Sequence, residues 1–179
     1  MPANDYKRED PPAKQAAPIF LVGFMGAGKT TVGKALAQRL GWEFWDLDEK
    51  IKAGAGKSVA TIFAELGESA FRAYETEAIK ACRGQIESVI ALGGGAYVSA
   101  GNRSIIRAIG SAIWLDCPLD TCLARIGRET GRPLLGSEAE MSALLEKRRS
   151  AYGEADHIVD AGVGEPDEIA ARIIEALRF

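Results

Sequence analysis

The chain has 179 residues, of which 47% are hydrophobic and 26% charged, a balance typical of a soluble globular domain. The 22 basic and 25 acidic residues give a net charge of −3, which disfavours nucleic acid and anionic membranes as partners. Three cysteines and one histidine disfavour a disulfide scaffold or a structural zinc site, and no apolar run approaches the roughly 20 residues that cross a bilayer.

Residues 1–17 are polar, contain three prolines and have almost no large apolar side chain. Such a segment buries too little surface to offset the entropy lost on ordering, so we expect a disordered tail before a single domain at 18–179. The tail also lacks the apolar stretch of a signal peptide. We therefore expect a cytoplasmic protein with reduced thiols that acts as a monomer.

Five short β-rich segments follow the tail and alternate with helical segments. They are Ile19–Gly23, Glu43–Asp46, Ser88–Leu92, Ala112–Asp116 and His157–Asp160. Several are apolar without alternation, which is typical of strands covered on both faces. Between them, apolar residues recur at helical spacing, as at Val32, Leu36 and Leu40. This pattern predicts an α/β fold in which helices sandwich a five-stranded parallel sheet.

Two segments interrupt this alternation. About forty residues separate the second predicted strand from the third, and we expect them to form a helical insertion near residues 47–80. The stretch around 125–137 is rich in arginine and glycine, which is typical of a mobile loop. Both segments are candidates for handling a substrate.

The most specific motif is Gly-Phe-Met-Gly-Ala-Gly-Lys-Thr at residues 23–30, which matches the phosphate-binding pattern G-x-x-x-x-G-K-[ST] in full. A predicted strand precedes it, and a predicted helix, Thr31–Leu40, follows it. Its backbone N–H groups would cradle phosphates, Lys29 would contact the β- and γ-phosphates, and Thr30 would ligate Mg²⁺. The predicted nucleotide-binding residues here are Gly26, Ala27, Gly28, Lys29, Thr30 and Thr31.

A dinucleotide-binding fold is the rival explanation of this glycine-rich segment. Gly26 and Gly28 begin the pattern G-x-G-x-x-G, but Thr31 stands where the third glycine is needed. Lys29 would also have no role there, and only Asp48, about 20 residues further on, favours the rival. The phosphate-binding loop therefore explains more of the segment.

Asp46 and Asp48 lie at the end of the second predicted strand. Residues i and i+2 of a strand share a face, so both carboxylates are predicted to project into the crevice where α/β sheets bind ligands. One could hold Mg²⁺ through water while the other meets the hydroxyl of a phosphate acceptor. The alternative is that one of them caps the N-terminus of a helix.

Five motifs in register resemble the shikimate kinase family over about residues 18–178. They are the phosphate-binding loop, the paired aspartates, the segment from Gly56 to Glu75, the glycine run 93–95 and the Arg-Pro-Leu-Leu loop at 132–135. The resemblance implies ATP and Mg²⁺, with shikimate as the phosphate acceptor. The expected products are ADP and shikimate 3-phosphate, in a step of aromatic amino acid biosynthesis.

The resemblance also assigns an acceptor site. Arg72 would bind the carboxylate of shikimate, and Glu75, one helical turn on, would hold the guanidinium in place. The Gly94 N–H and Arg148 would contact the same substrate. Arg149 is adjacent, so a shift of one position leaves it as an alternative to Arg148.

The groups that act on the transferred phosphoryl follow from the same resemblance. Asp48 would accept the proton of the attacking hydroxyl or orient it, and Asp46 would lie near the magnesium. Together with Lys29, Arg132 on a lid near 125–137 would stabilise the developing charge as the lid closes. Arg125 would lie against the adenine.

Two positions depart from the family pattern. Leu47 stands where serine or threonine is commoner, and the segment 161–164 has no cation to help hold adenine. The alternatives to shikimate phosphorylation are another small-molecule kinase, such as a gluconate kinase, and a nucleotide-binding regulator without catalysis. The intact Lys29, Asp48 and Arg132 oppose the regulator.

Overall fold

The five predicted strands form one parallel sheet in the computed structural model, which describes residues 16–129 and 136–178. The strands are β1 (Ile19–Val22), β2 (Glu43–Asp46), β3 (Ser88–Ala91), β4 (Ser111–Asp116) and β5 (His157–Asp160), in the spatial order β2-β3-β1-β4-β5. β1 and β3 lie inside the sheet and are buried along their whole length, which explains their continuous apolar sequences. The predicted fold class is confirmed, and every strand boundary lies within one residue of the prediction.

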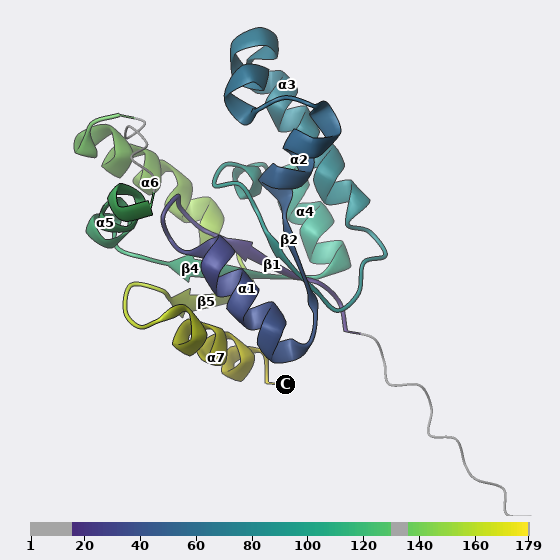
Figure 1. Ribbon diagram of the computed structural model, residues 1–179, viewed down its shortest axis with the longest axis vertical. Helices are drawn as coiled ribbons and strands as arrows, with labels where there is room; N and C mark the ends of the chain where they lie inside the picture. Colours follow the sequence, from purple (N-terminus) through teal and green to yellow (C-terminus); the bar gives the residue numbers. More distant parts are fainter. Residues whose placement is uncertain (1–15, 130–135, 179) are drawn as a thin grey trace, which may run out of the picture.

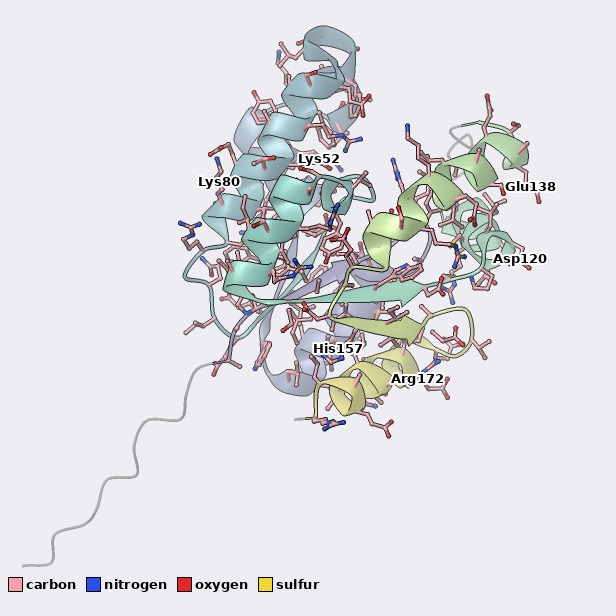
Figure 2. All side chains as sticks on the ribbon, turned by 180° about the vertical axis from the view of Figure 1, so that it is seen from behind. Lys52, Lys80, Asp120, Glu138, His157 and Arg172 are labelled. Carbon is pink, nitrogen blue, oxygen red and sulfur yellow. The ribbon has the colours of Figure 1, made fainter. Side chains whose placement is uncertain are left out.

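Helices cover both faces of this sheet (Figure 1). α1 (Lys29–Leu40) and α7 (Pro166–Leu177) pack together on one face, whereas α4 (Ala100–Ile109) lies on the other. Figure 2, seen from behind, shows α5 (Leu119–Glu129) and α6 (Glu138–Tyr152) on the side opposite α3, with Asp120 and Glu138 marking them. The main core lies between these layers, among residues such as Phe20, Ile90 and Ile113.

The predicted helical insertion consists of α2 (Leu47–Ala55) and α3 (Val59–Ala81), which extend away from the sheet in Figure 1. α3 is bent at Gly67, whose φ of 80° and ψ of 171° are not helical. The insertion has a small apolar core of its own, formed by Ile51, Ile62 and Phe71. The outer part of the insertion is therefore stabilised by its own packing more than by the main core.

The first described residues already contact the sheet, since the Ala16 carbonyl accepts a hydrogen bond from the Glu87 N–H at 2.8 Å. The rest of the predicted tail, residues 1–15, lies outside the described residues. Within the described ranges, no helix combines the length and apolar character needed to cross a membrane. The three cysteines are buried and unpaired as thiols, as expected.

Candidate active site

A cavity of about 1410 Å³ opens at the carboxyl ends of the strands. Its walls come from the phosphate-binding loop, the start of α2, the glycine run after β3, α5 and the start of α7. These segments are far apart in the sequence, and the parallel sheet brings them to one edge, where α/β proteins bind ligands. The loop and the two aspartates that the sequence singled out thus share one cavity.

The phosphate-binding loop turns through two glycines with positive φ, 75° at Gly26 and 94° at Gly28. A Cβ at Gly26 would also overlap the backbone carbonyl of Cys122 on α5, so this position requires glycine. α1 begins directly at Lys29, and its N-cap residue is Gly28, which has no side chain to cap the helix. The free N–H groups of this first turn, with the positive end of the helix dipole, suit phosphate oxygens.

Lys29 is partly buried at the base of this loop. Its ammonium donates to the carbonyls of Gly23 at 2.9 Å and Phe24 at 2.8 Å, which leaves one of its three protons for a ligand. Burial lowers the pKa of Lys29 to about 8, and the negative charge of Asp48 partly offsets that effect. A bound polyphosphate would favour the charged ammonium further.

Asp46 and Asp48 are arranged differently from the prediction that they share a strand face. β2 ends at Asp46, whose side chain accepts from the N–H groups of Asp48 and Glu49 and so caps α2. Asp48 lies in the first turn of that helix. The strand geometry was wrong and the capping alternative is right for Asp46, yet both carboxylates line the cavity.

Thr30 and Asp46 form the pair of oxygens that suits a magnesium ion. The Thr30 hydroxyl donates to Asp46 Oδ2 at 3.0 Å, and both side chains line the cavity beside the phosphate-binding loop. Mg²⁺ in phosphoryl-transfer sites takes one or two protein oxygens and completes its shell with phosphates and water. The described residues contain no cluster of three or more His, Cys, Asp or Glu that would hold a metal unaided.

Asp48 has a carboxylate oxygen that receives no hydrogen bond from the described residues. Within the described part of the chain, its Oδ1 is buried and has no hydrogen-bond partner. Burial raises the pKa of Asp48, and the nearby charge of Asp46 adds to the effect. A Cβ at Gly93 would lie only 2.7 Å from this oxygen, so the glycine keeps open the space in front of it. A buried, unpartnered carboxylate oxygen of this kind suits a ligand hydroxyl.

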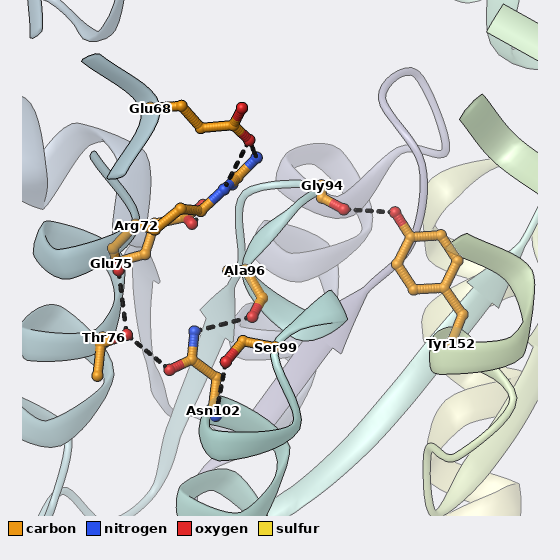
Figure 3. A network of polar contacts seen from close by, with 9 residues as sticks. All are labelled: Glu68, Arg72, Glu75, Thr76, Gly94, Ala96, Ser99, Asn102 and Tyr152. Carbon is orange, nitrogen blue, oxygen red and sulfur yellow. Dashed lines mark hydrogen bonds and ion pairs between the residues drawn. The ribbon is translucent and has the colours of Figure 1, made fainter. Parts of the chain in front are cut away.

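Arg72 lies over the glycine run, and two carboxylates hold it (Figure 3). Its Nη1 donates to Glu75 at 2.7 Å and its Nη2 to Glu68 at 2.9 Å. A Cβ at Gly95 would overlap the guanidinium, so this position requires a residue without a side chain. Glu75 is buried, which raises the pKa of its carboxyl. The predicted Arg72–Glu75 pair is present, and Glu68 is a partner that the sequence did not reveal.

α6 supplies the opposite side of the glycine run. Arg148 Nη1 lies 3.2 Å from the position that a Cβ at Gly94 would take, whereas Arg149 pairs with Glu146 and stacks on the Trp114 ring. Tyr152, which is fully buried, donates its hydroxyl to the Gly94 carbonyl. This geometry favours Arg148 over Arg149 as the substrate contact. Tyr152 follows Arg148 by four residues, about one helical turn, and this spacing was the sequence signal for its place near the glycine run.

Arg125 lines the cavity from α5. Its Nη1 lies 3.3 Å from the Ala27 carbonyl of the phosphate-binding loop and 3.5 Å from the Cys117 sulfur. Arg132 and the central part of the predicted lid, residues 130–135, lie outside the described residues. The sequence-predicted site residues that are described thus gather around the cavity or the glycine run that borders it.

The amino-acid sequence is similar to those of known proteins. The family described as "Shikimate kinase" matches residues 25–178. A shikimate kinase of Halorhodospira halophila is 44% identical over 164 residues, covering 89% of this chain and 93% of the relative. One of Methylococcus capsulatus is 43% identical over 162 residues, covering 88% of this chain and 90% of the relative.

The fold is also similar to those of solved structures. A shikimate kinase from Acinetobacter baumannii in complex with shikimate superposes with a TM-score of 0.85 at 36% identity, covering 91% of this chain and 93% of that one. A gluconokinase from Sinorhizobium meliloti superposes with a TM-score of 0.57 at 20% identity, covering 91% of this chain and 96% of the other. The second likeness concerns the fold alone.

Proposed function

The chain belongs to the shikimate kinase family, and from this premise we propose that it transfers the γ-phosphoryl group of ATP to the 3-hydroxyl of shikimate. The products are ADP and shikimate 3-phosphate, in a step of aromatic amino acid biosynthesis. The observation that carries the proposal is that Asp48 Oδ1 is buried without a hydrogen-bond partner among residues 16–129 and 136–178, in the same cavity as the phosphate-binding loop. A hydroxyl acceptor and a phosphoryl donor can therefore meet there.

The loop and α1 bind the donor in this proposal. Backbone N–H groups from Gly26 to Thr31 surround the phosphates, and the Lys29 ammonium neutralises charge between the β- and γ-phosphates. Arg125, which lines the cavity, would lie against the adenine, and Arg132 would add positive charge at the transferred group. Because phosphoryl transfer depends on positioning and charge stabilisation, these groups account for most of the rate.

The acceptor is bound on the other side of the cavity. Arg72 offers its guanidinium to the carboxylate of shikimate, and Arg148 and the Gly94 N–H contact the same molecule. Asp48 accepts the hydrogen of the attacking hydroxyl and orients that oxygen toward phosphorus. As the bond to phosphorus forms, the hydroxyl proton passes to Asp48 and ADP leaves.

Thr30 and Asp46 are the residues that would hold Mg²⁺, since their oxygens lie 3.0 Å apart in the cavity. When bound, the ion neutralises phosphate charge. The protein's own contribution here is to keep the hydroxyl and the carboxylate together, which the capping role of Asp46 secures by fixing its side chain.

A coupled assay of ADP release tests the function directly. Purified protein is given ATP and Mg²⁺ with shikimate, gluconate or a nucleoside monophosphate as acceptor. The proposal predicts turnover with shikimate far above turnover with the others. Strong turnover with gluconate alone would identify the small-molecule kinase alternative, and nucleotide binding without turnover of any acceptor would favour a regulator.

A further inference from the structure

We propose that Thr76 and Asn102 form a positioning pair that holds Arg72 in register with the glycine run 93–95, and thereby set the affinity for the acceptor without affecting that for ATP. In the described part of the chain, Thr76 and Asn102 both lie outside the lining of the cavity. The inference rests on the proposed role of Arg72 in binding the acceptor carboxylate. It concerns how this chain keeps that guanidinium in place.

The pair links three separate elements (Figure 3). Asn102, on α4, is 2% exposed, and its Nδ2 donates to the Ala96 carbonyl at 2.9 Å. Ala96 begins η1 (Ala96–Val98), directly after the glycine run. The Thr76 hydroxyl, on α3, lies 2.8 Å from Asn102 Oδ1. The buried Asn102 amide therefore contacts α3 through its oxygen and η1, directly after the glycine run, through its nitrogen.

Thr76 is also tied to Arg72 itself. Its hydroxyl lies 3.0 Å from the Arg72 carbonyl, one helical turn earlier on α3. The single hydroxyl proton is shared between the Arg72 carbonyl and Asn102 Oδ1, while the hydroxyl stays within reach of both. Contacts thus run from Arg72 through Thr76 and Asn102 to Ala96, next to the glycine that the guanidinium covers.

The guanidinium has little freedom in this position. A Cβ at Gly95 would overlap it, so a small slide of α3 along the glycine run would either separate the two or force them together. Side-chain misplacement on the scale of 1 Å is enough to cost a large factor in an active site. The register of α3 against the glycine run is therefore a functional quantity.

The segment of α3 after the bend at Gly67 packs on apolar residues, and its register is fixed by a polar contact. The small core of Ile51, Ile62 and Phe71 spans the bend, since Ile62 precedes Gly67 and Phe71 follows it. The segment after the bend carries Arg72 and Thr76, and Thr76 contacts Asn102 on α4. Apolar contacts do not fix a register by themselves, whereas a buried hydrogen bond with defined partners does, because a shift leaves its polar atoms unpaired.

The test compares Thr76→Val, which keeps the shape and removes the hydroxyl, with Thr76→Ser, which keeps the hydroxyl. Thr76→Val should raise the KM for shikimate about fivefold, the equivalent of one neutral hydrogen bond, with the KM for ATP unchanged. Thr76→Ser should restore the wild-type KM for shikimate. Asn102→Ala should behave like Thr76→Val if it folds, and Thr76→Val alone decides the question if it does not.

A double-mutant cycle shows whether the effect passes through Arg72. In an Arg72→Met background, Thr76→Val should have no further effect on the KM for shikimate, because the group that it positions is gone. Equal losses for both substrates, an unchanged KM for shikimate, failure of Thr76→Ser to restore it, or full additivity with Arg72→Met would each overturn the positioning pair. If the proposed function itself were wrong, the wild-type protein would not phosphorylate shikimate, and the two failures are therefore distinct.

Discussion

The nucleotide side of the cavity and the acceptor side are held together in different ways. On the nucleotide side, the phosphate-binding loop joins β1 to α1, both of which contribute to the main core, and the groups proposed to bind phosphate are mostly backbone N–H. On the acceptor side, the proposed binding groups are side chains from α2, α3 and α6, and α3 is bent at Gly67. One side is built from a continuous segment, the other from contacts between segments.

This difference predicts how the two sides respond to change. A backbone cradle in a tightly packed core should tolerate substitutions outside it, while the acceptor side should depend on a few polar contacts around Arg72. Substitutions on one side should leave binding of the other substrate nearly unaffected.

Loss of Lys29 should have the largest effect. Lys29→Met removes the ammonium at the base of the loop and should lower kcat/KM for ATP by about 10³-fold. Lys80→Met is a suitable control, because Lys80 is an exposed lysine on α3 that pairs with Glu77. Steady-state kinetics measures both variants. A loss of less than tenfold in Lys29→Met would remove the lysine from phosphate stabilisation.

Asp48→Asn should lower kcat for shikimate phosphorylation by about 10²-fold, since an amide neither takes the hydroxyl proton nor carries charge. The melting temperature should not fall, because burial of the ionised carboxylate already raises its pKa and the neutral amide needs less hydration. Glu77→Gln, a change at an exposed carboxylate, is the control. An unchanged kcat would exclude Asp48 from the chemistry.

Glu75→Gln should have a smaller effect that depends on pH. Burial raises the pKa of Glu75 above its ordinary 4.5, and protonation as the pH falls through that raised value breaks its ion pair with Arg72. In the wild type, kcat/KM for shikimate should therefore decline on the acid side. In Glu75→Gln it should be roughly fivefold lower at neutral pH, with the acid decline shifted to lower pH. An acid decline at the same pH in both proteins would contradict this role for Glu75.

The sequence predicted the nucleotide side well because its determinants are local. The motif at 23–30 contains the glycines, the lysine and the start of the helix, so the chain order alone places them. β1 and β3 were predicted within one residue because buried parallel strands are continuously apolar. α1 begins at Lys29 instead of Thr31, since the loop passes directly from Gly28 into the helix.

The acceptor side was predicted only in part. Asp46 and Asp48 were placed on one strand face, but capping by Asp46 ends β2 there and starts a helix. Thr76 and Asn102 lie 26 residues apart, and nothing in the local sequence pairs them. Their contact depends on how α3 packs on α4, which residue spacing does not show.

Separate binding measurements on Arg72→Met test the division between the two sides most directly. Isothermal titration calorimetry gives the Kd of shikimate and the Kd of ADP for the variant and the wild type. Loss of charge-assisted hydrogen bonds should weaken the binding free energy of shikimate by about 1.5–3 kcal/mol, which raises its Kd tenfold or more. The Kd of ADP should stay within about twofold. Equal weakening of both ligands, or unchanged shikimate binding, would contradict the account.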